Sequence, residues 1–188
     1  MIPLLLPDPP LADERVVLRP LVEGDVADVV EGCRDPLVQR FTRVPVSYTE
    51  DDARAFIGGA PDRRARGVSL ELAIAGATGE RLEGVISLVR DRWDVERAEV
   101  GYWVAPRARG AGVASRALTL LSRWALEEVG FARIDLQASV ANPGSLRVAE
   151  RCGYVREGRL RRAWYRGEQR EDMVLFSLVD GDLAGPGA

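Results

Sequence analysis

The stretch that decides the fold is Glu99-Val-Gly-Tyr-Trp-Val-Ala-Pro-Arg-Ala-Arg-Gly-Ala-Gly-Val-Ala-Ser115. Its first part is rich in β-branched and aromatic residues, which predicts a strand that ends at the proline. From about Gly112 the apolar residues take a helical spacing, and Val113, Ala117 and Leu121 fall on one face. The sequence therefore predicts a strand, a glycine-rich turn and an amphipathic helix in direct succession.

The regions on either side of this stretch alternate between strand-like and helix-like patterns. The predicted strands are residues 15–21, 68–75, 82–90, 98–104, 134–140, 154–161 and 172–179. The other predicted helices are residues 24–33, the segment from Thr49 to about Gly58-Gly59, and the segment from Asn142-Pro143 to Gly153. Together they predict an α/β (α+β) domain with a mixed sheet of about seven strands flanked by helices. We expect a flexible N-terminal arm at residues 1–12, a single domain at 13–180 and a disordered tail at 181–188.

Composition limits the chemistry that this domain can perform. The 188 residues carry a net charge of −3, no histidine, and 26 basic residues that are all arginine. Without histidine the chain cannot form a Ser-His or Cys-His nucleophile pair. Without lysine it cannot form a Schiff base or a phosphate loop of the G-x-x-x-x-G-K-[ST] type. Catalysis must therefore use carboxylates, hydroxyls, arginines, backbone dipoles or a bound cofactor.

Cysteine content and hydropathy bear on location and partners. Cys33 and Cys152 are too few for a disulfide framework and, without histidine, for a zinc site, so we expect two buried thiols and no metal. No segment is apolar enough to span a membrane, and the proline-broken start is unlike a signal peptide. The slightly acidic balance argues against nucleic acid as a partner. These features predict a cytoplasmic protein.

The glycine turn predicts an anion site. Gly110 and Gly112 allow a ligand to approach the backbone, and the first N–H groups of the following helix have no helical partner. Arg107 and Arg109 add positive charge, so a phosphate or pyrophosphate is the expected ligand. The alternative is that the glycines only make a tight turn. A dinucleotide is disfavoured because Ser115 stands where that fingerprint needs a third glycine or alanine.

Several motifs in one order resemble a known family. Arg107-x-x-Gly110-x-Gly112 follows a strand, and Asn142-x-x-Ser145 and Cys152-Gly153-Tyr154 come later. These motifs resemble the GNAT acyltransferase superfamily. The stretch Glu99–Val104 and the segment from Tyr154 to Asp172 resemble its RimJ/RimL-like branch of N-terminal acetyltransferases. The resemblance implies a mostly antiparallel sheet that is splayed at the cofactor site.

The resemblance also implies acetyl-CoA (coenzyme A) as the cofactor. Its pyrophosphate would lie on the N–H groups of Arg109 to Ala114, and its pantetheine arm would pair with the backbone at Trp103 and Val104. The implied cofactor-binding residues are Trp103, Val104, Arg107, Arg109, Gly110, Ala111, Gly112, Val113, Ala114, Asn142, Ser145 and Arg151.

Acetyl transfer to an amine needs a base for the amine and a hydrogen-bond donor for the leaving thiolate. Glu99 is the candidate base, acting through water, and Glu71 is the second candidate. The alternative is that Glu99 is a surface residue paired with an arginine such as Arg97. Ser145 can donate a hydrogen bond to the sulfur. Ala149 replaces a tyrosine acid found in many relatives, which leaves Ser145 or an unassisted thiolate.

Other residues near this site carry two readings each. Asn142 caps its helix and can also contact the cofactor arm. Arg147 and Arg151 either reach the 3′-phosphate of the cofactor or lie on a solvated helix face. Tyr154 is expected in the core.

The resemblance implies an amine acceptor, either a protein N-terminus or a small molecule. It nominates Phe41, Trp93, Trp164 and Tyr165 as acceptor contacts, although each aromatic is also a candidate for the core. The basic run from Arg156 to Arg170 indicates strand-surface charge or an acidic acceptor. A homodimer is compatible with the resemblance. The alternative to an enzyme is a non-catalytic acyl-CoA-binding sensor or interaction module on the same fold.

Overall fold

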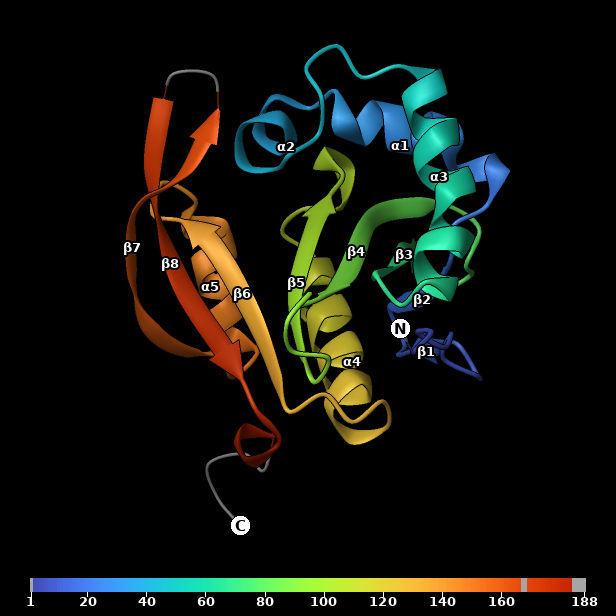
Figure 1. The fold of residues 1–188 in the computed structure, drawn as a ribbon. Coiled ribbons are helices and arrows are strands. Elements are labelled where there is room, and N and C mark those ends of the chain that lie inside the picture. The colour runs from blue at the N-terminus through green and yellow to red at the C-terminus, as the bar shows by residue number, and fades with distance from the viewer. Residues whose placement is uncertain (1, 167–168, 184–188) are drawn as a thin grey trace.

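The computed structural model describes residues 2–166 and 169–183, which form one eight-stranded sheet with helices on both faces (Figure 1). The strand order is β1-β2-β3-β4-β5-β6-β8-β7. The strands are β1 (Leu11–Ala12), β2 (Val16–Pro20), β3 (Ser69–Gly76), β4 (Leu82–Arg90), β5 (Arg97–Val104), β6 (Arg133–Ser139), β7 (Val155–Arg166) and β8 (Gln169–Leu178). The α-helices are α1 (Val26–Cys33), α2 (Pro36–Phe41), α3 (Glu50–Ala65), α4 (Val113–Glu127) and α5 (Pro143–Arg151). Among the described residues, no helix combines the length and the hydropathy that a membrane crossing requires.

The sheet is splayed between β5 and β6, as predicted. These two strands are parallel and pair only where Arg97, Ala98 and Glu99 meet Arg133, Ile134 and Asp135. Every other neighbouring pair of strands is antiparallel. Beyond Glu99 the two strands diverge, and Figure 1 shows β5 and β6 separating toward α2. The second half of β5 therefore has a free edge on the side of β6.

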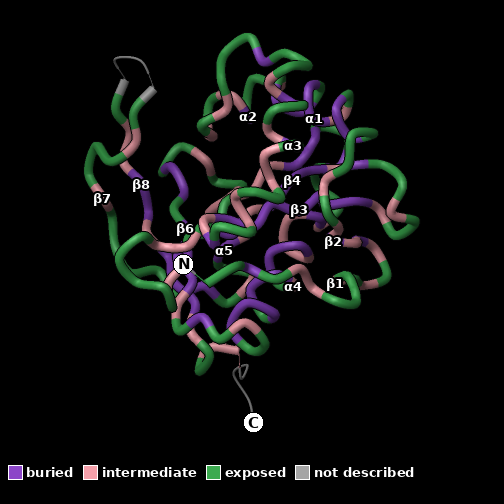
Figure 2. Tube along the Cα trace, turned by 45° about the vertical axis from the view of Figure 1, so that its right-hand side comes forward, coloured by how far each residue is buried: buried purple, intermediate pink, exposed green. Residues whose placement is uncertain are grey.

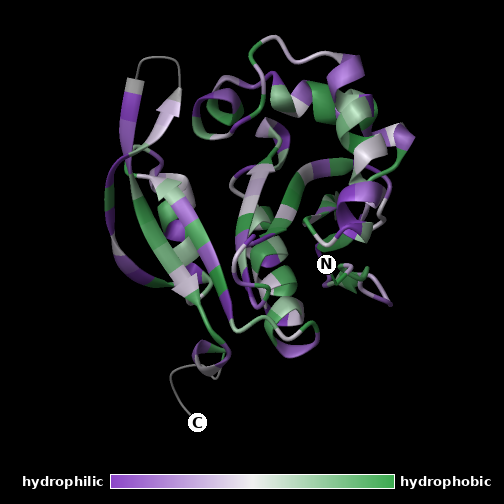
Figure 3. Ribbon diagram, viewed as in Figure 1, coloured by the Kyte–Doolittle hydropathy of each residue, from purple (hydrophilic) through white to green (hydrophobic). Residues whose placement is uncertain are grey.

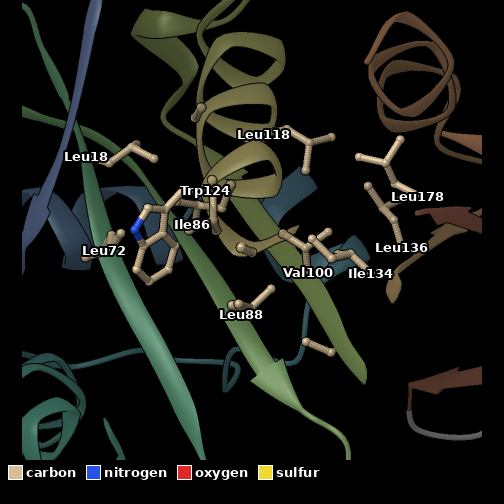
Figure 4. Close-up of a cluster of buried hydrophobic side chains, with 14 of the residues drawn as sticks. Leu18, Leu72, Ile86, Leu88, Val100, Leu118, Trp124, Ile134, Leu136 and Leu178 are labelled. Atoms are coloured by element: carbon tan, nitrogen blue, oxygen red, sulfur yellow. The ribbon is translucent and has the colours of Figure 1, made fainter. Parts of the chain in front are cut away.

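Two hydrophobic cores hold the helices to the two faces. On one face, α4 packs Leu118 and Trp124 against sheet residues such as Ile86, Leu88 and Val100 (Figure 4). On the other face, α1 and α3 pack against the sheet around Ala73 and Val85. Alternate residues of a strand point to opposite faces, so the central strands contribute to both cores. Figure 2 shows β3 buried, whereas the outer loops are exposed.

Local sequence signals explain how the two helices that border the splay begin. Gly112 takes a left-handed conformation with φ +75° immediately before α4. Asn142 caps α5 by accepting a hydrogen bond from the N–H of Ser145 at 3.1 Å, and Pro143 occupies the first helical position. Gly153 follows α5 with φ +81°, in keeping with its predicted role as the end of that helix.

Helix α3 does not end at Gly58-Gly59, so that prediction is wrong. It continues through both glycines and Pro61 to Ala65. Glycine weakens a helix by only about 1 kcal/mol relative to alanine. Packing offsets this cost, because Ile57 is buried and Arg63 in the last turn forms an ion pair with Glu71.

The peripheral elements differ most from the sequence prediction. Strand β1 is additional to the seven predicted strands, and it lies in the segment predicted as a flexible arm. In the same segment Leu4 is buried and donates its N–H to the Arg64 carbonyl at 3.1 Å. Of the tail predicted at 181–188, residues 184–188 lie outside the described residues. Strand β7 extends to Arg166 and is largely hydrophilic (Figure 3), as suits an edge strand.

Candidate active site

A cavity of about 1240 Å³ lies over the free edge of β5. Its walls come from α2 and the loop after it, from the glycine turn before α4, from the start of α5 and from the β7–β8 hairpin. The sequence-predicted residues that line it are Phe41, Glu99, Trp103, Val104, Arg109, Gly110, Gly112, Val113, Ala114, Asn142, Ser145, Arg151 and Trp164. Segments far apart in the sequence thus meet in one hollow.

The register between β4 and β5 decides which backbone groups face the cavity. Ala105 donates its N–H to the Glu83 carbonyl, and Asp91 donates to the Arg97 carbonyl, so the odd-numbered residues of β5 direct their backbone groups toward β4. Trp103 therefore faces Val85, and the predicted backbone pairing at Trp103 is corrected to Tyr102 and Val104. The backbone groups of these two residues face the free edge.

The glycine turn presents unpaired N–H groups to the cavity. Gly110 and Gly112 have φ values of +79° and +75°, and a side chain added at Gly110 would meet no atom within 4 Å. Within the described part of the chain, no carbonyl accepts from the N–H groups of residues 110–112. The first-turn N–H groups of α4 also lack helical partners. The helix dipole adds partial positive charge, so this turn has the features of an anion site.

The two arginines of the turn are held by carboxylates. Arg109 donates to the Val104 carbonyl at 3.1 Å and forms an ion pair with Asp35, the capping residue of α2. Arg107 forms ion pairs with Asp28 at 2.8 Å and Glu31 at 3.0 Å on α1. Arg107 does not line the cavity, so its predicted place beside the ligand is corrected to a structural link between the turn and α1.

Glu99 lies on the cavity wall and has a neutral hydrogen-bond partner. Gln137 of β6 donates its side-chain amide to Glu99 at 3.2 Å, while Arg97 pairs with Asp135. Glu99 is exposed, and it lines the cavity. Desolvation raises the pKa of Glu99 above its ordinary value, Arg43 opposes the rise, and Asp135 adds to it. The alternative of a surface residue paired with Arg97 is confirmed for the exposure of Glu99 and wrong for the pair, because Arg97 binds Asp135.

Glu71 is held away from the cavity. It is buried and accepts hydrogen bonds from Arg63 at 2.9 Å and from Ser69 at 2.6 Å. It does not line the cavity, so the structure removes it as the second candidate base.

Ser145 is fixed at both its backbone and its side chain. Its N–H bonds the Asn142 cap, and its Oγ lies 2.8 Å from the Oη of Tyr102 on β5. Desolvation is the largest cause that raises the pKa of Tyr102, to about 12, so this phenol keeps its proton at neutral pH. Tyr154 instead lies in the core, as predicted, where its hydroxyl bonds Ser122 at 2.7 Å.

The predicted acceptor aromatics divide into two groups. Phe41 and Trp164 line the cavity, and the guanidinium of Arg43 stacks over the Trp164 ring at 5.4 Å. Trp93 is 82% exposed in the β4–β5 turn, and Tyr165 is 65% exposed on the hairpin. Neither lines the cavity, so both are corrected from acceptor contacts to surface residues. Ala111, a predicted cofactor-binding residue, does not line the cavity either.

Sequence reasoning missed Tyr102, Gln137 and Arg43 as cavity residues. The period-2 alternation of a strand could have identified Tyr102. It places Glu99 and Tyr102 on opposite faces, and at an open strand edge both faces can border one cavity. Gln137 and Arg43 depend on long-range packing and carry no local signal. Arg147 and Arg151 both lie on the cavity wall, exposed on α5, which accommodates either of their two readings.

The two free cysteines match the expected pair of buried thiols only in part. Cys33 is buried, and desolvation raises its pKa to about 12. Cys152 is half-buried and donates to the Ser115 carbonyl at 3.3 Å.

Comparison with known proteins identifies the family. Residues 15–155 match the model of the acetyltransferase (GNAT) domain. The chain is 30% identical to the ribosomal-protein-serine acetyltransferase of Escherichia coli over 131 residues, which are 70% of this chain and 72% of that protein. It is 34% identical over 102 residues to YdaF of Bacillus subtilis, which carries the name of a ribosomal N-acetyltransferase; that match spans 54% of this chain and 56% of YdaF.

A solved structure shows the same fold. RimL, a ribosomal L7/L12 alpha-N-protein acetyltransferase in complex with coenzyme A, superposes with a TM-score of 0.78 at 21% identity, covering 90% of this chain and 96% of RimL. The family match extends from β2 to the start of β7 and so includes the splay, the glycine turn and α5. The chain therefore belongs to the GNAT acetyltransferase family.

Proposed function

We propose that this protein is an acetyl-CoA-dependent N-acetyltransferase that transfers an acetyl group to a primary amine by direct attack. One observation carries the proposal. At the free edge of β5, Glu99 and Tyr102 point to opposite faces of the strand, and Tyr102 contacts Ser145. A base and a hydroxyl donor thus lie on either side of the edge along which an extended ligand can pair.

The residues present fit coenzyme A. The open glycine turn offers N–H groups for the pyrophosphate, and a side chain at Gly110 would project into free space rather than into protein. The backbone groups of Tyr102 and Val104 face the open edge and suit an amide-containing arm, although the Val104 carbonyl already accepts a hydrogen bond from Arg109. Arg147 and Arg151 provide cations at the same wall for a further phosphate.

Acetyl-CoA would supply the activated thioester carbonyl, and the protein would supply position and proton transfer. Holding two reactants in attack geometry is worth about 7–11 kcal/mol. Glu99 would accept the amine proton through water, with a raised pKa that suits this task. Ser145 would donate a hydrogen bond to the sulfur. An α-amine has a pKa of about 8, against about 10.4 for lysine, so a weaker base is enough to deprotonate it.

We propose a protein N-terminus as the acceptor in preference to a small amine. The names of the E. coli relative and of RimL support a protein acceptor. The cavity is also wide enough to run from the glycine turn to Phe41 and Trp164, which leaves room for residues beyond the amine.

Calorimetry with acetyl-CoA and a thiol-release assay over peptides and small amines would test this function. We expect saturable binding, turnover on at least one amine, and an acetyl group on its nitrogen by mass spectrometry. Binding without turnover on any amine would favour the acyl-CoA sensor. Absence of binding would contradict both readings.

A further inference from the structure

A hydrogen bond spans the open edge of the sheet. The Oη of Tyr102 on β5 lies 2.8 Å from the Oγ of Ser145 in the first turn of α5, and both residues line the cavity. Because β6 pairs with β5 only as far as Glu99, this contact crosses the region where the sheet has opened. It connects the strand that borders the ligand edge to the candidate sulfur-side hydroxyl.

The backbone that carries Ser145 is fixed. Asn142 holds the Ser145 backbone at 3.1 Å, and Pro143 begins the helix. The Tyr102 ring packs at the edge of the core formed by α4 and the sheet. A hydroxyl that accepts one hydrogen bond within a protein is polarised and donates its own proton more strongly.

We propose that Tyr102 is a positioning residue that donates its hydroxyl to Ser145 and thereby directs the Ser145 proton toward the sulfur of the thioester. This inference rests on the proposed acetyl transfer. The amine nitrogen forms the new N–C bond, the C–S bond breaks, and its electron pair stays on sulfur. Ser145 donates a hydrogen bond to that sulfur as negative charge develops. The thiolate then takes a proton from water, and the amine releases one through Glu99, so protons balance.

A hydrogen bond in the opposite direction, from Ser145 to Tyr102, would exchange the roles of the two residues. If Ser145 donated to Tyr102, the phenol proton would be free to reach the sulfur. Two single variants and their combination distinguish the arrangements. If Tyr102 is the donor, Ser145→Ala lowers kcat at least as much as Tyr102→Phe does. Tyr102→Phe then has no further effect on kcat in a protein that already lacks the Ser145 hydroxyl.

The experiment measures kcat and KM for acetyl-CoA in Tyr102→Phe, Ser145→Ala and the double variant. We expect Tyr102→Phe to lower kcat about fivefold, the size of one neutral hydrogen bond, with an unchanged KM. The matched control is Tyr154→Phe, which removes the same hydroxyl from a second Tyr–Ser pair, outside the cavity lining. It should lower thermal stability and leave kcat unchanged.

A second readout separates positioning from packing. The selenoester analogue of acetyl-CoA has a leaving group that needs little hydrogen bonding, because selenols are much more acidic than thiols. The defect of Tyr102→Phe should shrink with this substrate, whereas a packing defect would persist unchanged.

The outcomes separate the inference from the function beneath it. A wild-type protein without turnover would overturn the proposed function. Two results with an active wild type would overturn only the role of Tyr102. One is a Tyr102→Phe variant with unchanged kcat, and the other is a Tyr102→Phe defect that is equal with the thioester and the selenoester. A larger loss in Tyr102→Phe than in Ser145→Ala would overturn the polarity and make the phenol the donor.

Discussion

Gln137 donates its side-chain amide to the carboxylate of Glu99 at 3.2 Å, while the nearby Arg97 is engaged by Asp135. Glu99 therefore has a neutral partner in place of a cation, and desolvation can raise its pKa. Arg43, the largest cause that opposes this rise, stacks over Trp164, and both residues line the cavity. This arrangement keeps the candidate base available to a proton instead of locking it in an ion pair.

Glu99→Gln should reduce kcat/KM about 100-fold at pH 7, within the range of a lost general base. The loss should be smaller at pH 9, where an α-amine is neutral without help. Steady-state kinetics across pH with a peptide acceptor would measure it. The control is Glu96→Gln, an exposed carboxylate outside the cavity lining. A loss that is equal at both pH values would remove Glu99 as the base.

Gln137→Glu should move the acidic limb of the kcat/KM profile to higher pH. A like charge beside Glu99 disfavours the ionised form, so the pKa of the base rises further and more alkali is needed to deprotonate it. Gln137→Leu removes the hydrogen bond that lowers the pKa of Glu99 and should move the limb in the same direction by less. A limb that stays in place in both variants would show that Glu99 does not control it.

Local patterns predicted the elements that build the site. The predicted bounds of β4, residues 82–90, coincide with the observed strand. The Asn142 cap and the Gly112 start of α4 also lie where predicted. Each of these signals depends on a few adjacent residues, whose backbone preferences act before any tertiary contact forms.

Long-range partners account for the parts that could not be predicted. Arg107 belongs to the motif, yet Asp28 and Glu31 engage it from a helix far away in the sequence. Trp103 has a backbone direction set by its register with Val85. Neither partner nor register is encoded within the neighbouring residues, so the motif placed the glycine turn at the cavity but misplaced these two members.

Gly112→Glu should abolish binding of coenzyme A, because it places a carboxylate at the anion-binding turn. The φ of +75° also strains any side chain there, so the control must carry the same strain. Gly79→Glu supplies it: Gly79 has φ +74° in the β3–β4 turn, and a side chain there would meet no atom within 4 Å. Calorimetry should show binding lost only in Gly112→Glu. Retained affinity would contradict the pyrophosphate assignment.

Glu157→Gln should destabilise the fold at neutral pH. Glu157 on β7 accepts from Arg133 at 2.6 and 2.8 Å and from Ser177 at 2.6 Å, and the Arg133 hydrogen bond is the largest cause that lowers its pKa to about 2. A lowered carboxyl pKa contributes stability above its unfolded value of 4.5, and the contribution disappears as pH falls toward 2. The Tm difference from wild type should therefore become smaller as the pH is lowered from about 6 to about 3. A constant difference would mean that packing, not charge, is lost.

Two glycine-to-alanine changes in helices should have opposite effects. Gly58→Ala in α3 adds a methyl group where no atom lies within 4 Å, so it should stabilise the fold by about 0.5–1 kcal/mol. Gly32→Ala in α1 drives its methyl group into the ring of Trp103, and overpacking of this kind costs about 1–3 kcal/mol. Urea denaturation would measure both. Because Trp103 is part of β5, Gly32→Ala should also displace the edge that carries Tyr102 and lower kcat, whereas Gly58→Ala should not. A Gly32→Ala variant with normal stability and activity would show that this close packing does not hold the strand in place.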